Sequence, residues 1–229
     1  MNQMETMLSL QQKLNDSTNG KGWENGFTKF GKKIDWRRCI YLEAAELVES
    51  YPWKHWKSID AKVDRANVEV ELVDIWHFVM SEILRVNKLN DNLPIVELAI
   101  RLEDAIGDIT VQKIEDDYYA EIEAIEALLH KLFCHFELVD FTKSYFELCA
   151  KLGLSFERLY QLYIGKNILN IFRQDNGYKE GTYIKVWSGK EDNVVMQEIL
   201  ASNSSIAAEE LYKKLEEKYE GAKSQEPRA

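Results

Sequence analysis

Apolar residues recur along most of this chain every three or four positions, which is the spacing of one helix face rather than of a strand. The sequence holds only 3 prolines and 11 glycines, and most of these lie between the periodic stretches. No region is dominated by strand-like alternation, so the chain is predicted to be an all-α helical bundle. The predicted helices cover residues 2–16, 35–50, 64–86, 94–106, 115–136, 138–151, 155–174 and 193–219.

The length of 229 residues suits one domain or two closely merged ones. We expect a single all-α domain over 1–219, with a less regular segment at about 165–192 where glycine and lysine are frequent and periodicity is lost. The last residues, 220–229, are polar and have no periodic apolar pattern. They are predicted to form a disordered tail.

The net charge of −10 argues against partners that need a broad basic surface, namely nucleic acids and anionic membranes. No apolar run is long enough to cross a bilayer, and the first residues do not resemble a signal peptide. The three cysteines are far apart and form no CxxC motif. These features predict a reduced, cytoplasmic protein.

Acidic residues three positions apart occur in two helical segments: Glu43 and Glu46, then Glu71 and Asp74. Residues at this spacing share a helix face, so two such faces in contact would gather four carboxylates. Oxygen-only ligands indicate Mg²⁺, with Mn²⁺ as a substitute. A solvated acidic face is the plain alternative. A di-iron site is another, but His77 supplies only one of the two carboxylate–histidine pairs that it needs.

A local basic island lies within residues 165–190, and Lys166, Asn170 and Arg173 fall on one helix face. Arginine and lysine bind phosphate oxygens, and the Gly/Tyr/Lys loop that follows could close over a polyphosphate as a lid. Spaced basic residues alone are equally typical of a solvated face. Next to a Mg²⁺ cluster, however, they favour a nucleotide polyphosphate.

A nucleotide base needs a polar reader and an aromatic wall. Gln11 and Asn15 are one helical turn apart, and their amides can both donate and accept hydrogen bonds. Trp53 and the His77–Phe78 pair could supply the wall. Each of these residues is, taken alone, more often structural.

The motifs together resemble those of the dimeric, all-α dUTPase family. They are EAAE, then ExxD followed by IWHF, then GKNILNIFRQDNGYKEG, and also LQQKLN, SYPWKHWK and WSGKEDN, so the resemblance covers most of residues 4–195. The wider superfamily includes the MazG-type nucleoside triphosphate pyrophosphohydrolases. The joint pattern is specific, although ExxE alone is not.

The resemblance implies a homodimeric enzyme that hydrolyses dUTP, and also dUDP, to dUMP with Mg²⁺. It implies that Glu43, Glu46, Glu71 and Asp74 are metal ligands, that Glu43 or otherwise Glu46 is the general base, and that Glu49 supports them. It assigns uracil and sugar contacts to Gln11, Asn15, Trp53, His77 and Phe78. It assigns phosphate contacts to Lys166, Asn170, Arg173, Tyr178, Lys179 and Lys185.

Two alternatives stay open. A broader MazG-like pyrophosphohydrolase would use the same carboxylates on other bases, and a strong preference for uracil would separate the two. A non-enzymatic helical scaffold would leave its acidic faces solvated. It would tolerate the substitution Glu46→Gln without loss of metal binding.

Overall fold

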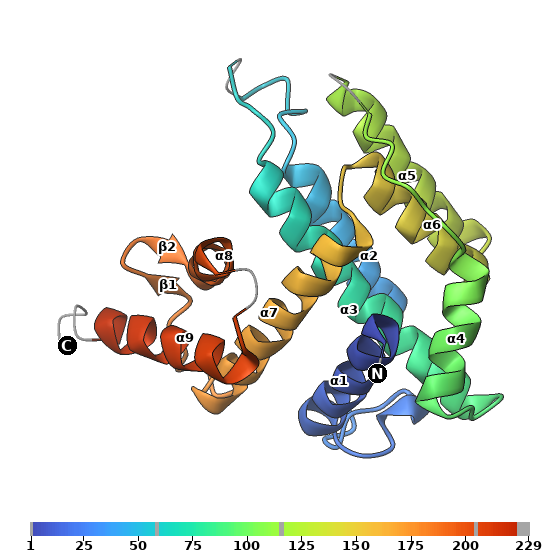
Figure 1. The fold of residues 1–229 in the computed structure, drawn as a ribbon, viewed down its shortest axis with the longest axis horizontal. Coiled ribbons are helices and arrows are strands. Elements are labelled where there is room, and N and C mark those ends of the chain that lie inside the picture. The colour runs from blue at the N-terminus through green and yellow to red at the C-terminus, as the bar shows by residue number, and fades with distance from the viewer. Residues whose placement is uncertain (1, 58–59, 115–116, 204–205, 224–229) are drawn as a thin grey trace. The chain divides into compact units, whose positions relative to one another are not determined.

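The computed structural model describes residues 2–57, 60–114, 117–203 and 206–223, and helices dominate these residues (Figure 1). The prediction of an all-α fold is confirmed. The helices are α1 (Gln3–Asn19), the 3₁₀ turn η1 (Trp23–Asn25), α2 (Trp36–Glu49), α3 (Arg65–Leu89), α4 (Ile95–Ile106), α5 (Tyr118–Cys134), α6 (Leu138–Lys151), α7 (Phe156–Asp175), α8 (Asp192–Ser202) and α9 (Ala208–Lys223). Two short strands, β1 (Val186–Trp187) and β2 (Lys190–Glu191), pair antiparallel.

The chain forms two compact units, 1–159 and 160–229. The first unit contains α1 to α6 and the beginning of α7, and the second contains the rest of α7, the hairpin, α8 and α9. The expectation of a single domain over 1–219 stays a prediction. Within the described residues, no helix combines the length and the apolar character that a membrane span would need.

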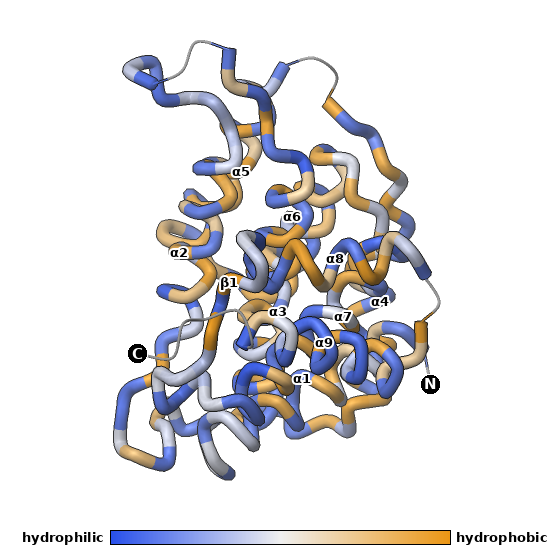
Figure 2. Tube along the Cα trace, turned by 90° about the vertical axis from the view of Figure 1, so that its left-hand side faces the viewer, coloured by the Kyte–Doolittle hydropathy of each residue, from blue (hydrophilic) through white to orange (hydrophobic). Residues whose placement is uncertain are grey.

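Helix α3 is the central element of the first unit. It is apolar and buried along most of its length, and Trp76 stacks on Tyr145 of α6 with ring centroids 5.3 Å apart. The Tyr145 hydroxyl donates a hydrogen bond to the Leu72 carbonyl at 2.7 Å, which ties α6 to α3. Apolar and polar stretches alternate along the chain in Figure 2, as expected when each helix buries one face.

Helices α2 and α3 begin at aspartates that cap them. The Asp35 side chain accepts a hydrogen bond from the Arg38 amide, and the Asp64 side chain accepts one from the Asn67 amide. Each cap satisfies an amide that the first helical turn leaves without an intrahelical partner. The caps therefore fix where the two acidic motifs begin along their helices.

The second unit is built around an aromatic cluster. Phe172 of α7 contacts Trp187 of β1 and Tyr219 of α9, with ring centroids 5.8 Å and 5.4 Å apart. Trp187 and Tyr219 are almost fully buried. The cluster joins the hairpin and the last helix to α7.

Two details of the predicted C-terminal helix were wrong. The single helix expected over 193–219 is two helices, because Asn203 leaves the helical conformation after α8. Asparagine and serine side chains compete for backbone hydrogen bonds and favour helix ends. Helix α9 continues to Lys223, so residues 220–223 are helical, while 224–229 lie outside the described residues.

The hairpin β1–β2 was also missed in the expected irregular segment. Ser188 and Gly189 connect its strands, and both have positive φ angles, 50° and 82°. This is the two-residue turn that matches the twist of paired strands. Strands of two residues are too short to show an alternating pattern.

We predict that Gly165→Val destabilises the protein by about 1–3 kcal/mol, the usual cost of overpacking. A Cβ at Gly165 would lie 2.6 Å from Leu200 Cδ1 and 2.8 Å from Met196 Sδ, both on α8. Gly221 of α9 has nothing within 4 Å of the same position, so Gly221→Val is the matched control. Urea unfolding measures both variants, and equal stabilities would contradict the close approach of α7 and α8.

Candidate functional site

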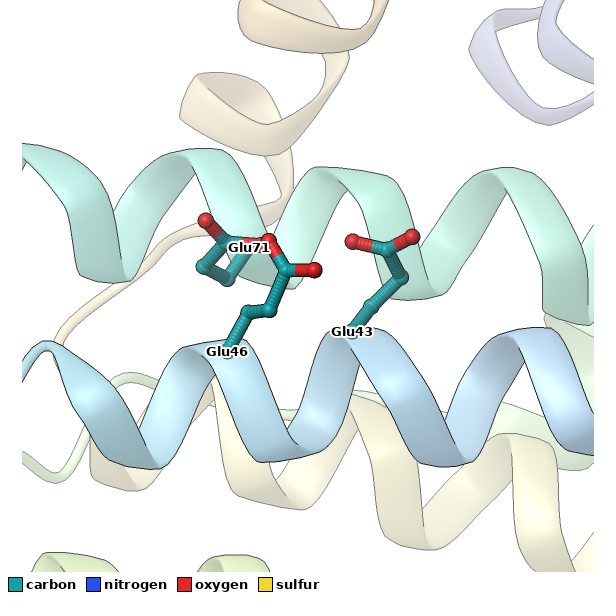
Figure 3. A group of neighbouring side chains, drawn as sticks. All are labelled: Glu43, Glu46 and Glu71. Carbon is teal, nitrogen blue, oxygen red and sulfur yellow. The ribbon is translucent and has the colours of Figure 1, made fainter.

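Three of the four predicted carboxylates come together between α2 and α3. Glu43 and Glu46 rise from α2 toward α3, which carries Glu71 (Figure 3). One oxygen from each residue lies within 4.8 Å of the others. Glu71 is buried, Glu43 is half-buried and Glu46 is exposed, so the cluster reaches from the interior to the solvent at Glu46.

The donor set of this cluster fits a hard divalent cation. Three like charges repel when held this close, and a carboxylate as buried as Glu71, which is 6% exposed, is costly without compensation. Carboxylate oxygens are the ligands that Mg²⁺ and Mn²⁺ prefer. The cluster could therefore hold a metal ion.

Two further acidic residues lie near the cluster but outside it. Asp74 follows Glu71 by one turn of α3 and is half-buried. Its charge acts on Tyr145 of α6. The burial of Tyr145 raises the pKa of its hydroxyl well above the ordinary value, and Cys149 and the Asp74 charge add smaller contributions in the same direction. Glu49 forms an ion pair with Lys54. The metal-binding role of Asp74 and the supporting role of Glu49 stay predictions.

The electrostatics of the cluster extend to Cys39, one turn before Glu43 on α2. Burial, followed by the negative charge of Glu43, raises the pKa of the Cys39 thiol to about 11. The thiol is therefore protonated at neutral pH. Cys39, Cys134 and Cys149, all within the described residues, are free thiols.

The two predicted base-reading amides lie together in a buried network. Gln11 Nε2 donates to Asn15 Oδ1 at 3.2 Å and to Ser81 Oγ at 3.0 Å, and Asn15 Nδ2 donates to Ser81 Oγ at 3.0 Å. His77 Nδ1 lies 2.7 Å from Gln11 Oε1, and an amide oxygen only accepts, so His77 donates. The Ser81 hydroxyl donates to the His77 carbonyl at 2.8 Å.

Ser81 is the part of this network that sequence reasoning missed. It is fully buried and bonds to both amides, so it fixes how the side chains of Gln11 and Asn15 are turned. The only signal in the sequence is its position one turn beyond His77 on the same face of the predicted helix. A lone serine in an apolar helix does not indicate such a partner.

The predicted aromatic wall is divided between two places. Phe78 stacks on Trp36, at the start of α2, with ring centroids 5.9 Å apart. Trp53 lies past the other end of α2, where its ring contacts Trp56 edge-on at 5.6 Å and Lys54 lies over it. A contact of either ring with a base stays a prediction.

The predicted phosphate-binding residues belong to the second unit. Arg173 donates to Asp192 through Nε and Nη2, both at 2.8 Å, and to Asn170 Oδ1 at 3.2 Å. The Arg173 guanidinium also lies 5.7 Å from the ring centroid of Tyr178. Lys166, 4% exposed, donates to Asn193 Oδ1 at 2.9 Å. The structure thus brings Lys166, Asn170, Arg173 and Tyr178 together.

The other two predicted phosphate contacts lie at the surface. Lys179 is exposed, and Lys185 is 3.3 Å from Glu191 beside the hairpin. Both of these residues stay predictions as phosphate ligands.

Asp192 and Asn193, at the start of α8, were missed as functional candidates. Asp192 is fully buried, and it accepts two hydrogen bonds from Arg173 and one from the Tyr183 hydroxyl at 2.8 Å. It therefore sets the orientation of the Arg173 guanidinium. Asp192 directly follows Glu191, just past the basic segment 165–190, so its place in the sequence does not single it out as a partner of Arg173.

A comparison with protein-family models identifies the family of this chain. A model described as dUTPase matches residues 3–178. The chain belongs to the dUTPase family. This dUTPase is therefore a hydrolase, a dUTP diphosphatase, with a nucleotide as its substrate. A search of curated proteins found no match.

The matched segment of this dUTPase contains all three clustered carboxylates and the amide network. It ends at Tyr178, so Lys179, Lys185 and Asp192 lie beyond it. Their roles in the dUTPase are inferred from this chain rather than from the match.

We predict that Asp192→Ala destabilises the protein by about 3–5 kcal/mol, because it leaves the Arg173 charge buried without its partner. Glu198→Ala is the control, since it breaks the exposed Lys190–Glu198 pair of the same unit and costs at most about 1 kcal/mol. Chemical denaturation measures both. Similar losses in the two variants would contradict a buried Arg173–Asp192 pair.

Proposed function

We propose that this dUTPase hydrolyses dUTP, and also dUDP, to dUMP in a Mg²⁺-dependent reaction. The observation that carries the proposal is the cluster of Glu43, Glu46 and Glu71, with oxygens within 4.8 Å of one another, in a chain of this family. The family resemblance further supports a cytoplasmic homodimer.

The four carboxylates of α2 and α3 are the metal ligands in this proposal: Glu43, Glu46, Glu71 and Asp74. Bound there, Mg²⁺ or Mn²⁺ would neutralise phosphate charge and lower the pKa of water. The buried Glu71 anchors the group, and the exposed Glu46 is the ligand that solvent reaches first.

The chemical step is attack of a water oxygen on the α-phosphorus. The bond from that phosphorus to the bridging oxygen breaks, and pyrophosphate leaves from dUTP or phosphate from dUDP. Glu43, or otherwise Glu46, takes the proton that the water loses. The leaving phosphates are stabilised by hydrogen bonds from basic and polar side chains: Lys166, Asn170, Arg173, Tyr178, Lys179 and Lys185.

In this proposal the amides of Gln11 and Asn15 read uracil beside His77 and the ring of Phe78. Trp53, past the other end of α2, contacts another part of the nucleotide. The amides can donate to the uracil carbonyls and accept from its N–H group. A tight pocket excludes the extra methyl of thymine by steric contact. Both amides are already held by Ser81, so little side-chain entropy is lost when the base binds.

We predict that pyrophosphate is released rapidly from dUTP only, and only with Mg²⁺, when dUTP, dTTP, dCTP and UTP are compared. Glu46→Gln should lower the dUTP rate by about 10²–10⁴-fold, the range for loss of a group that assists proton transfer. Glu69→Gln, the same change on α3 and outside the cluster, should keep most of the rate. Comparable cleavage of several bases would favour the MazG-like alternative.

A second prediction concerns Ser81→Ala. Without the hydroxyl, the side-chain amides of Gln11 and Asn15 lose the partner that orients them. An amide that rotates by 180° exchanges its donor and acceptor positions and can then hydrogen-bond to cytosine. We expect the ratio of kcat/KM for dUTP over dCTP to fall about tenfold, the worth of one hydrogen bond. Ser17→Ala is the control, because the Ser17 hydroxyl donates its hydrogen bond within α1, to the Leu14 carbonyl. An unchanged ratio for Ser81→Ala would contradict the role of the network.

A further inference from the structure

A carboxylate on α5 is buried in the first unit and has no part in the proposed reaction. Glu121 is 0% exposed. Its Oε2 accepts hydrogen bonds from the Tyr51 hydroxyl at 2.7 Å and from Arg65 Nη1 at 2.5 Å. Among the residues that the structure describes, Oε1 has no hydrogen-bond partner.

The two donors stand at the two ends of the segment that joins α2 to α3. Tyr51 follows the last residue of α2 by two positions, and Arg65 is the first residue of α3. A direct link joins the same ends, because Ser50 accepts hydrogen bonds from the Asp64 amide and the Asn67 side chain, both at 2.9 Å. Glu121 thus connects the end of α2 to the start of α3, the two helices that carry the cluster.

The cost of this arrangement indicates that it does more than fill space. A buried carboxylate is expensive to desolvate, and an apolar side chain of similar volume often packs as well or better. What the carboxylate adds is direction, because two donors from different elements must meet one oxygen. Burial and the hydrogen bond to Glu121 raise the pKa of the Tyr51 hydroxyl, so it remains a donor at neutral pH.

We propose that Glu121 is a positioning residue for the carboxylate cluster: by holding Tyr51 and Arg65 it sets the register of α2 against α3. The register determines how far Glu46 of α2 lies from Glu71 of α3. This inference rests on the proposed function, in which the cluster binds a divalent cation. Mg²⁺ tolerates little error in ligand distance, so a small slip of one helix lowers its affinity.

The test is Mn²⁺ binding to the nucleotide-free protein, measured by electron paramagnetic resonance, for Glu121→Gln and Tyr51→Phe. Each variant removes charge or a hydroxyl while keeping the volume. We expect the dissociation constant for Mn²⁺ to rise about 10–100-fold, the usual effect of disturbing a residue behind a metal ligand. The Mg²⁺ concentration for half-maximal dUTP hydrolysis should rise by the same factor, while kcat at saturating Mg²⁺ stays near wild type.

Two controls separate positioning from general damage. Glu69→Gln makes the same change on α3, where Glu69 pairs with Arg158 at 2.8 Å, and should bind Mn²⁺ as wild type does. Leu128→Ala removes a buried side chain from α5 itself and should lower Tm without changing Mn²⁺ affinity. If Glu121→Gln does not fold, Tyr51→Phe decides the question.

Unchanged Mn²⁺ affinity in Glu121→Gln or, where that variant does not fold, in Tyr51→Phe would overturn the inference, as would an equal loss in Leu128→Ala. Glu46→Gln is measured alongside to separate this failure from failure of the proposed function. If Glu46→Gln loses Mn²⁺ but the deciding variant, Glu121→Gln or otherwise Tyr51→Phe, does not, only the role of Glu121 is wrong. If Glu46→Gln also binds as wild type does, the cluster is not the metal site and both proposals fail.

Discussion

Like charges meet where α2 packs against α3, and the first unit has to hold them there. Two carboxylates about 4 Å apart repel by roughly 4 kcal/mol at the effective dielectric constant of a protein surface. The apolar face of α3 opposes this repulsion, since Trp76 and Tyr145 bury it against α6. Capping by Asp35 and Asp64 fixes where α2 and α3 start, and therefore which positions of each helix carry the acidic residues.

The second unit handles charge in the opposite way. There a cation and an anion, Arg173 and Asp192, are buried together, and the pair is neutral as a whole. Arg173 keeps a defined orientation because three acceptor residues surround it: Asp192, Asn170 and Asn193. The first unit therefore concentrates negative charge that a cation would neutralise, whereas the second unit holds a basic group, Arg173, in a fixed orientation.

Helical periodicity was strong enough to place most helices from the sequence. The two acidic motifs predicted that Glu43, Glu46, Glu71 and Asp74 would meet, and the first three of these form the cluster. This worked because residues three apart share a face whatever the tertiary structure. The roles of Ser81, Glu121 and Asp192 could not be predicted, because each depends on partners from distant segments. The break at Asn203 and the hairpin turn were missed because both are set within a few residues.

The amide network has a physical character of its own. Gln11, Asn15 and Ser81 carry no charge, and their hydrogen bonds are buried. Mobile ions screen interactions between exposed charges strongly and those between buried dipoles weakly. In the proposed reaction, rising ionic strength should therefore lower the affinity for metal and phosphates well before it lowers the selectivity for uracil. Affinity and base selectivity in this dUTPase would then be separable by salt alone.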